Sequence, residues 1–348
     1  MIPRSLAEVD GIFLTALMQP KCPGVAVTGF AIEGEVHGTA TKAKLRLFYG
    51  PGPAGPATIY IKGGWEESSE ILRQIGIYCR EPRAYSELLP RLGVAAPQCY
   101  GAIWDEAALD GVLLLEDLDA AGATIRTPES IVGVDEVHDL LLGLARMHGV
   151  TAGSRLPQGA WIRTLFEDSE RPGSYLRHIL EEEQLLSYLS LPRGIGIPEK
   201  LHDPGMIRRS FDRTLAQGLG ETDLVLLHGD AHVGNSFVDA AGRPALLDWQ
   251  CVSTGGWAFG VAYYLASALS TEGKRAAEGD LLAAYAACLA ASGGPGLTAD
   301  AALATYTAYL SYGFLVWLAN STSFQPERLN ALVGARFAEA MLDHDMAG

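Results

Sequence analysis

A short run of polar residues stands between two apolar segments in the second half of the chain. The segment reads LVLLHGDAHVGNSFVDAAGRPALLDWQ, and its central carboxylates and amide are Asp230, Asn235 and Asp248. The runs LVLL and ALLDW are typical of buried strands, and polar groups at the ends of buried strands cost free energy unless they are used. We therefore expect these three side chains to carry chemistry.

The spacing of these residues is typical of phosphoryl-transfer sites. Asp230 and Asn235 fit the pattern H-x-D-x-x-x-x-N, and Asp248 follows at the end of the next predicted strand. In such sites one aspartate orients and deprotonates a hydroxyl group, while an asparagine and a second aspartate hold Mg²⁺ through oxygen atoms. The pattern assigns the catalytic role to Asp230 and metal binding to Asn235 and Asp248.

Two histidines in the same loop offer a different interpretation. His228 and His232 stand on either side of Asp230 and could be ligands of a metal ion. The phosphoryl-transfer pattern already explains His228 as a residue that hydrogen-bonds the loop backbone, and His232 as one that shapes the loop. We therefore favour phosphoryl transfer, and we expect Trp249 to serve only in packing.

The motifs HGD and DWQ, together with Asn235, resemble those of the aminoglycoside phosphotransferase and choline-kinase-like superfamily. Within it, the chain most resembles the ecdysteroid-kinase-like small-molecule kinases. The phrases LLLEDL and EPRAYSELLPRLGVAAPQCYG belong to the same pattern, and the resemblance extends from about Glu33 to Leu269. It implies a two-lobed protein-kinase-like fold that uses ATP and Mg²⁺.

The resemblance also implies an ion pair that holds the nucleotide. Lys62, at the end of ATIYIK, would bind the α- and β-phosphates. Glu81 would pair with Lys62, and Glu70 and Glu87 are other candidates for this partner.

Four further nucleotide-binding positions follow from the resemblance. Glu116 and Leu118 would face adenine through a backbone C=O and N–H. Gly38 and Thr39 would lie in the loop that covers the phosphates, within the segment EGEVHGTATKAK.

One position departs from the family pattern. In the segment WAFGVAYYLASAL, Gly260 stands where the superfamily usually carries an aspartate that supports the catalytic loop. This difference motivates an alternative function, a kinase-fold protein that binds a ligand without turnover. The presence of Lys62, Asp230, Asn235 and Asp248 favours an active enzyme.

The elements that must position these residues change in character along the chain. Residues 31–62 and 95–118 alternate or form short apolar runs as strands do, residues 68–92 are helical with an interruption at Pro82, and helical patterns dominate from Val134 onward. We predict an α+β chain: a β-rich N-terminal lobe over residues 1–118 that binds nucleotide, and a larger, mostly helical lobe over 119–348 that carries the catalytic loop and the acceptor site.

Charge and composition exclude several classes of function. The 348 residues include 26 Lys and Arg against 41 Asp and Glu, a net charge of −15, which disfavours nucleic acid as a partner. The five cysteines form no C-x-x-C pair, and no P-loop, Rossmann or serine-hydrolase motif is present. We expect a cytoplasmic protein.

One segment could be mistaken for a membrane span. Residues 301–320 contain no charged side chain, but they include Thr, Ser, Asn and three tyrosines. We expect a buried helix of a folded core, because the polar side chains weaken insertion into lipid.

The acceptor is expected to be a small molecule with a hydroxyl group, bound by the helical lobe. Its aromatic residues favour a lipophilic alcohol or a hydroxyacyl thioester, although most of them are expected to be core; they are Trp161, Tyr175, Tyr188, Tyr306, Tyr309, Tyr312, Phe314 and Trp317. An aminoglycoside or macrolide is the alternative acceptor, but Glu181–Glu183 is more typical of a solvated helix face. The sequence leaves the oligomeric state and the choice between ATP and GTP open.

Overall fold

The computed structural model describes residues 2–66, 69–159, 161–167, 169 and 174–345. Contacts divide the chain into two compact units. Unit 1 comprises Met1–Ile125 and Phe237–Val252, and unit 2 comprises Arg126–Ser236 and Ser253–Gly348. The α+β prediction is confirmed, because an antiparallel sheet dominates the first unit and helices dominate the second.

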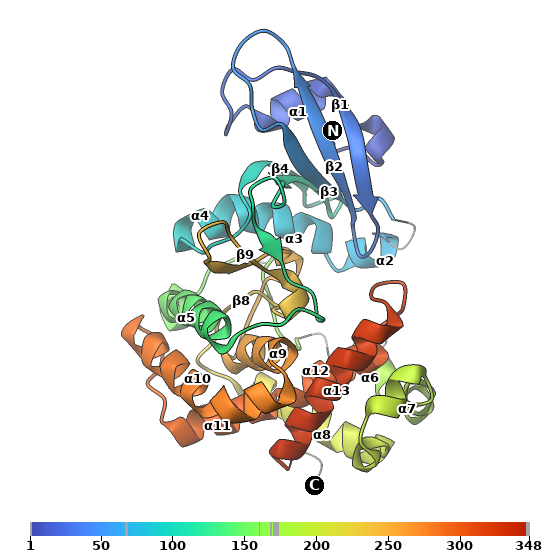
Figure 1. Ribbon diagram of the computed structural model, residues 1–348, viewed down its shortest axis with the longest axis vertical. Coiled ribbons are helices and arrows are strands. Elements are labelled where there is room, and N and C mark those ends of the chain that lie inside the picture. Colours follow the sequence, from blue (N-terminus) through green and yellow to red (C-terminus); the bar gives the residue numbers. More distant parts are fainter. Residues whose placement is uncertain (1, 67–68, 160, 168, 170–173, 346–348) are drawn as a thin grey trace. The chain divides into compact units, whose positions relative to one another are not determined.

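Unit 1 is built from antiparallel strands and short helices (Figure 1). In chain order its elements are η1 (Leu6–Glu8), α1 (Gly11–Met18), β1 (Val27–Val36), β2 (Thr41–Tyr49), β3 (Thr58–Gly63), α2 (Ser69–Gln74), α3 (Ile77–Arg83), η2 (Ala84–Leu88), α4 (Leu89–Leu92), β4 (Cys99–Asp105), β5 (Asp110–Glu116), β6 (Thr124–Ile125), β9 (Ser236–Val238), β10 (Pro244–Leu246) and η7 (Trp249–Cys251). Five of the strands form one sheet in the order β1-β2-β3-β5-β4.

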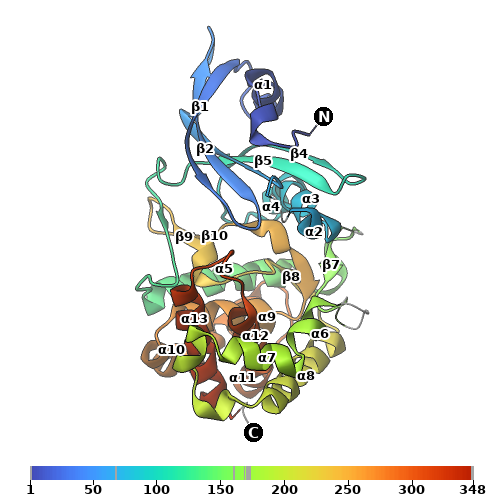
Figure 2. The same ribbon diagram turned by 90° about the vertical axis from the view of Figure 1, so that its right-hand side faces the viewer.

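The two faces of this sheet have different coverings, because side chains alternate along each strand. Ile61 and its cross-strand partner Leu114 belong to the apolar core that includes residues of α1. On the opposite face, a Cβ at Gly111 would lie 2.5 Å from the carbonyl oxygen of Tyr78 in α3. Figure 2 shows α1 and α3 on the two sides of the sheet. Lys62, next to Ile61, therefore points to the face that α3 covers.

The helical segment after β3 differs from the prediction at one residue. Pro82 lies inside α3 rather than at a break between helices. The irregularity comes just afterwards, where η2 is a short π-helix between α3 and α4. A π-helical turn is a known way for a helix to absorb a local disturbance of its hydrogen-bond pattern.

The extent of unit 1 also differs from the predicted lobe, which ends at residue 118. Unit 1 continues to Ile125 and takes in a later segment. The cause is strand pairing: β6 pairs antiparallel with β9, and β10 lies on the other side of β9. Leu118, Phe237 and Ala245 form a small core of their own beside these strands. Local sequence patterns carry no signal for a pairing between segments so far apart in the chain.

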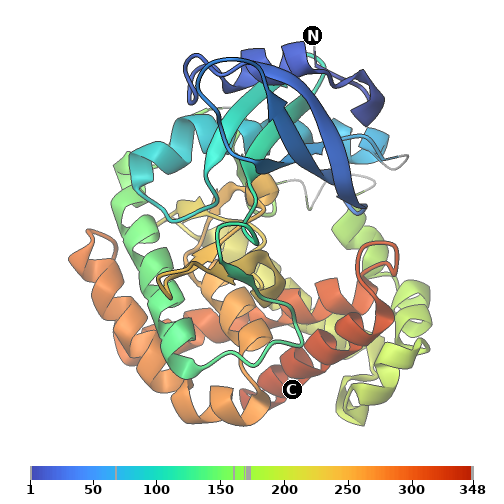
Figure 3. The ribbon, with the colours of Figure 1, turned by 45° about the horizontal axis from the view of Figure 1, so that its top comes forward.

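Unit 2 consists mainly of helices around one small sheet. Its elements are α5 (Val134–Thr151), η3 (Gly153–Arg155), β7 (Arg163–Thr164), α6 (Tyr175–Ile179), α7 (Glu182–Leu189), η4 (Pro192–Gly196), η5 (Glu199–Leu201), α8 (Pro204–Gly220), β8 (Val225–Leu227), η6 (Val233–Asn235), β11 (Ser253–Gly255), α9 (Ala258–Ala268), α10 (Thr271–Ala291), α11 (Ala299–Ala308), α12 (Leu310–Ala319) and α13 (Glu327–Asp343). The strands are ordered β7-β11-β8, and α5 lies beside α10 (Figures 1 and 3).

The apolar segment near residue 310 is part of the core of unit 2. The stretch Ala299–Ala319 is long and apolar enough to cross a membrane, but it is divided into α11 and α12, and α12 packs against α8 and α13. Phe314 and Leu318 are fully buried. A Cβ at Gly313 would lie 2.1 Å from the Phe337 ring, so the close approach of α12 and α13 requires glycine there. This agrees with the predicted core helix.

Candidate functional site

A buried ion cluster joins three predicted site residues within unit 1. The Lys62 ammonium lies 2.6 Å from Glu81 Oε2 and 2.7 Å from Asp248 Oδ1. All three side chains are less than a tenth exposed. β3 places Lys62 on the face of the sheet that α3 covers, and Glu81 lies in α3. The structure therefore brings Lys62 and Glu81 together as an ion pair, which is the pairing that the sequence predicts.

The alternative partners of Lys62 lie elsewhere. Glu87 accepts a hydrogen bond of 2.9 Å from Arg83 one helical turn earlier. The side chain of Glu70 lies outside the described part of the chain. Among the described carboxylates, Glu81 and Asp248 hold Lys62.

Asp248 is placed by an unusual backbone conformation. It follows β10 and has φ 67° and ψ 62°, the left-handed region that few residues other than glycine adopt. Such conformations cost on the order of 1–3 kcal/mol and are often found at functional sites. The next residue, Trp249, is fully buried as predicted, and its backbone N–H donates to Glu81 Oε1 at 3.1 Å. This bond ties the chain after Asp248 to α3.

A second lysine also reaches Asp248. Lys42 in β2 pairs with Lys62 across the sheet, so both side chains lie on the same face. The Lys42 ammonium lies 3.0 Å from Asp248 Oδ2 and is about one-third exposed, with a relative side-chain exposure of 34%. The sequence analysis missed this residue. The alternation of β2 places Lys42 on the Lys62 face, but only the cross-strand register brings the two lysines side by side.

The pKa values of the cluster follow from burial and from these contacts. Burial raises the pKa of the Asp248 carboxyl, but Lys42 and Lys62 outweigh burial and hold its pKa well below its ordinary value. Burial lowers the pKa of Lys62, but Asp248 and Glu81 raise it above its ordinary value. Burial raises the pKa of Glu81, and although Lys62 opposes this, the net shift is upward. Asp248 is therefore an anion and Lys62 a cation at neutral pH.

The predicted phosphate-covering loop lies between β1 and β2. Thr39 is fixed at two atoms: its carbonyl oxygen accepts from Tyr78 Oη at 2.5 Å, and its hydroxyl accepts from Gln250 Nε2 at 3.1 Å. A Cβ at Gly38 would meet nothing within 4 Å. The loop is thus tied to α3 and to η7 through Thr39, while the space around the Gly38 α-carbon stays open.

The predicted adenine-facing groups lie where β5 ends. The Glu116 N–H donates to the Gln98 carbonyl oxygen at 2.8 Å. The carbonyl oxygens of Asp117 and Leu118 accept bonds from the turn that follows. Within the described chain the Leu118 N–H donates to no other group, so it stays available to a ligand.

The predicted catalytic loop belongs to unit 2, between β8 and β9. Asn235 Nδ2 donates to the backbone oxygen of Asp230 and to Asp230 Oδ2, both at 2.9 Å. The amide of Asn235 is thus committed to Asp230, and its Oδ1 accepts no hydrogen bond from the described residues. The Asp230 side chain is 31% exposed.

The two histidines of the loop shape its backbone. His228 Nδ1 accepts from the Asp230 N–H at 3.3 Å, and His232 Nδ1 accepts from the Gly234 N–H at 3.0 Å. The His232 ring also packs edge-on against Trp317, with 5.2 Å between ring centroids. These contacts support the interpretation of both histidines as loop-forming residues.

Each predicted metal ligand, taken within its own unit, has the chemistry that Mg²⁺ prefers. Asp248 of unit 1 supplies an ionised carboxylate, and Asn235 of unit 2 supplies an amide oxygen that accepts no hydrogen bond from the described residues. No group of three His, Cys, Asp or Glu side chains in the described chain is placed to hold a metal by itself. Magnesium is often held by one or two carboxylates together with phosphates and waters, so a larger cluster is not required.

Half of the eight predicted acceptor aromatics are core. Tyr306, Tyr309, Phe314 and Trp317 are at most 2% exposed, whereas Tyr175 is 64% exposed. The run Glu181–Glu183 is exposed at the start of α7, as expected for a solvated helix face.

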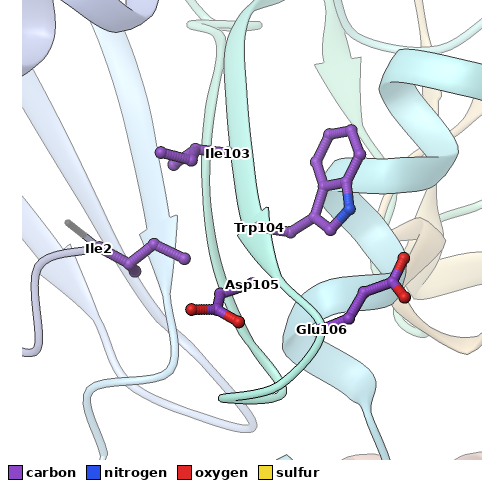
Figure 4. A pocket seen from close by; sticks show the side chains of 5 residues that line it. All are labelled: Ile2, Ile103, Trp104, Asp105 and Glu106. Atoms are coloured by element: carbon purple, nitrogen blue, oxygen red, sulfur yellow. The ribbon is translucent and has the colours of Figure 1, made fainter.

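A surface cavity in unit 1 is lined by none of these residues. It has a volume of about 380 Å³ at the β4–β5 hairpin (Figure 4), and it is lined by Ile2, Ile103, Trp104, Asp105 and Glu106. Asp105 accepts bonds from the backbone of the turn that follows it, and Glu106 pairs with Arg83. Its acidic groups therefore serve local structure.

Comparison with known proteins supplies a family. A model of the phosphotransferase enzyme family matches residues 78–298. A search of curated proteins finds no match.

Solved structures of similar fold extend over nearly the whole chain. Choline kinase LicA from Streptococcus pneumoniae is 15% identical with a TM-score of 0.50, covering 91% of this chain and 94% of that one. Macrolide 2'-phosphotransferase type I is 14% identical with a TM-score of 0.50, covering 93% and 94%. The GDP and kanamycin complex of an APH(2'') aminoglycoside phosphotransferase is 10% identical with a TM-score of 0.53, covering 94% and 98%. At these identities the likeness concerns the fold.

Proposed function

Because the chain belongs to the phosphotransferase enzyme family, we propose that it transfers the γ-phosphoryl group of ATP to a hydroxyl group of a small molecule. The observation that carries this proposal is the buried cluster of Lys62, Glu81 and Asp248. A buried ammonium held by two carboxylates is costly to desolvate, and phosphoryl transfer gives it a use.

The nucleotide is proposed to bind to unit 1. Lys62 binds the α- and β-phosphates, and Glu81 holds it in place. Gly38 and Thr39 cover the phosphates, while the Glu116 carbonyl oxygen and the Leu118 N–H receive adenine. The availability of the Leu118 N–H supports this assignment.

Mg²⁺ is proposed to bind Asn235 and Asp248, where it would neutralise charge on the phosphates. Asp230 accepts the proton of the acceptor hydroxyl as that oxygen bonds to the γ-phosphorus. The bond from the γ-phosphorus to the bridging oxygen breaks, and ADP leaves. Asn235 orients Asp230 for this step through its two hydrogen bonds.

The acceptor is proposed to be a lipophilic alcohol or a hydroxyacyl thioester. The exposed position of Glu181–Glu183 gives no buried acidic pocket for a polycation, which places an aminoglycoside second. The likeness to ecdysteroid-kinase-like enzymes and the cytoplasmic location stay predictions.

Gly260 favours a second candidate, a ligand-binding protein without turnover. The reason is that glycine has no side chain with which position 260 could support the predicted catalytic loop. Intact Lys62, Asp230, Asn235 and Asp248 favour the enzyme over this candidate.

A panel of hydroxylated compounds tests the proposal. The protein is incubated with ATP, Mg²⁺ and a mixture of hydroxyacyl thioesters, sterols, sugars, macrolides and aminoglycosides, and products are identified by mass spectrometry. We expect a product 80 Da heavier than one acceptor with the wild type, about the mass of one phosphoryl group that the reaction adds. The product is absent with Asp230→Ala and present with the exposed control Asp223→Ala. Bound ATP without any product or hydrolysis contradicts the enzyme and favours the binding protein.

A further inference from the structure

Gly260 stands where the family resemblance implies an aspartate, and little packs against its α-carbon. Gly260 lies in α9, and a Cβ built there would have one near neighbour, His148 Cε1 at 3.9 Å. The His148 ring in α5 is fully buried; its Nδ1 bonds the Tyr285 hydroxyl at 2.6 Å, and its Nε2 bonds no group in the described chain. A carboxylate at position 260 could form a hydrogen bond with the His148 ring. In this chain the first turn of α9 contributes no side chain to that place.

The last turn of α9 makes the contact with the catalytic loop instead. Ser267 Oγ accepts a hydrogen bond of 3.0 Å from the Val233 N–H. The Ser267 hydroxyl donates its own proton to the Tyr264 carbonyl oxygen, also at 3.0 Å, so a lone pair of Oγ is left facing Val233. The side chain is fully buried. This is a fixed acceptor that needs no reorganisation.

Val233 is the first residue of η6, the single turn that carries Asn235. The N–H groups at the start of a helical turn have no partner inside the turn, and a serine oxygen is a favoured partner for them. Here the serine comes from another helix, so the bond joins η6 to α9. Asn235, at the end of the same turn, holds Asp230. The position of Asp230 is therefore linked to Ser267 through η6.

The backbone carbonyl of Ser267 is bonded by an arginine. Arg336 in α13 donates from Nη1 to the Ser267 carbonyl oxygen at 2.6 Å. That oxygen is one of the last carbonyls of α9, where the helix dipole favours positive charge. The last turn of α9 is thus held by α13 while its serine holds the loop.

We propose that Ser267 is the positioning residue of the catalytic loop in this chain, in place of a side chain at position 260. This inference rests on the proposed function, since it assigns Asp230 as the base. Ser267 acts on the reaction only through η6 and touches no substrate.

Two readouts on Ser267→Ala test this, with Ser210→Ala as the control that removes a buried serine hydroxyl from α8 of the same unit. Amide hydrogen exchange on the nucleotide-free protein is expected to speed up at residues 231–235 in Ser267→Ala and not in Ser210→Ala. Phosphoryl transfer to the acceptor found in the panel, or to water where none is found, is expected to lose about 10–100-fold in kcat, as losses of supporting hydrogen bonds do. The KM for ATP is expected to change less than kcat, because the proposed contacts with the nucleotide itself lie in unit 1 and η6 contributes only the proposed metal ligand Asn235. Ser267→Thr, which keeps the hydroxyl, restores most of kcat.

The outcomes separate this inference from the proposed function. Unchanged exchange at residues 231–235 in Ser267→Ala overturns the role of Ser267, whatever the activity. Faster exchange with an unchanged kcat in an active wild type also overturns it. A wild type that transfers no phosphoryl group overturns the proposed function, and with it the role of Ser267 in positioning a base.

Discussion

Lys62 and its two carboxylates concentrate opposite charges in a place that water barely reaches. Removing one member of a buried ion group leaves its partners uncompensated, which typically costs 3–5 kcal/mol. We predict that Lys62→Met lowers the free energy of unfolding by about that amount, because among the described residues Glu81 then keeps the Trp249 N–H as its one hydrogen-bond partner. Urea unfolding measures the change, with Lys21→Met as an exposed control. A loss no greater than that of the control would contradict the cluster.

Lys42 occupies Asp248 in an ion pair, and in the proposed metal site it would compete with the divalent cation for this carboxylate. Two unit charges about 4 Å apart interact by about 1 kcal/mol in water and by several kcal/mol near a protein surface. We predict that Lys42→Met strengthens the binding of Mn²⁺, used as a probe for Mg²⁺, by about five- to tenfold in the nucleotide-free protein. The same change is expected to weaken ATP binding, since a positive charge beside Lys62, the proposed phosphate-binding residue, is lost. Paramagnetic resonance measures the free Mn²⁺, and an unchanged or weaker Mn²⁺ affinity would count against this assignment.

The sequence predicts the residues of the site that belong to a short-range motif or to the pattern of the family it resembles, such as Lys62 and Glu81. Asp230 and Asn235 are five residues apart in one loop, and their bond follows from a single turn. Lys42 and Ser267 were missed because their contacts with Asp248 and Val233 depend on strand register and helix packing. The sequence spacing of these residues gives no sign that they are in contact.

At the scale of elements, the Arg193 side chain contacts the end of α12 and the start of α13. It is 2% exposed, donates to the carbonyl oxygens of Trp317, Leu318 and Asn320 at the end of α12, and pairs with Glu327 at the start of α13. We predict that Arg193→Ala destabilises the protein by about 3–5 kcal/mol. Arg328→Ala, which breaks an exposed pair with Glu129, serves as the control and changes nothing measurable. Equal denaturation midpoints for the two variants would refute this role.

His148 makes the packing of α5 on α10 sensitive to acid. Burial lowers its pKa from 6.5 to about 3. The unfolded chain therefore binds a proton that the folded chain does not between about pH 6.5 and 3, so the contribution is complete above pH 6.5 and is lost as the pH falls. The full loss is on the order of 3–5 kcal/mol. We predict that the unfolding free energy of His148→Gln falls less steeply across this window than that of the wild type or of exposed His138→Gln. Parallel pH profiles would rule this out.

Strands and helices were predicted where their patterns are local. The hairpin of β4 and β5 follows from two apolar runs around an acidic turn, and α5 from its amphipathic repeat. Helix α1 was not predicted, although Asp10, whose Oδ1 accepts from the Phe13 N–H at 2.7 Å, is a recognisable helix-capping signal. The pairing of β6 with β9 joins segments about a hundred residues apart, and it moved the boundary between the units.

At the scale of the whole molecule, the candidate site residues are divided between the two units. Unit 1 holds the lysines, Glu81 and Asp248, and unit 2 holds Asp230 and Asn235. We propose that unit 1 binds the nucleotide and unit 2 supplies the base. Substitutions of Lys62 and of Asp230 are therefore expected to affect different kinetic constants, whereas a substitution of Asn235, a proposed metal ligand in unit 2, is expected to affect both.

The most direct test compares ATP binding with single-turnover phosphoryl transfer in Asp230→Ala. We predict that its dissociation constant for ATP with Mg²⁺ stays within about twofold of the wild type, while the rate of product formation falls by at least about a hundredfold, as expected for loss of a general base. An undiminished rate would contradict the assignment of Asp230. Loss of ATP binding together with the rate would contradict the separation of nucleotide binding from base catalysis.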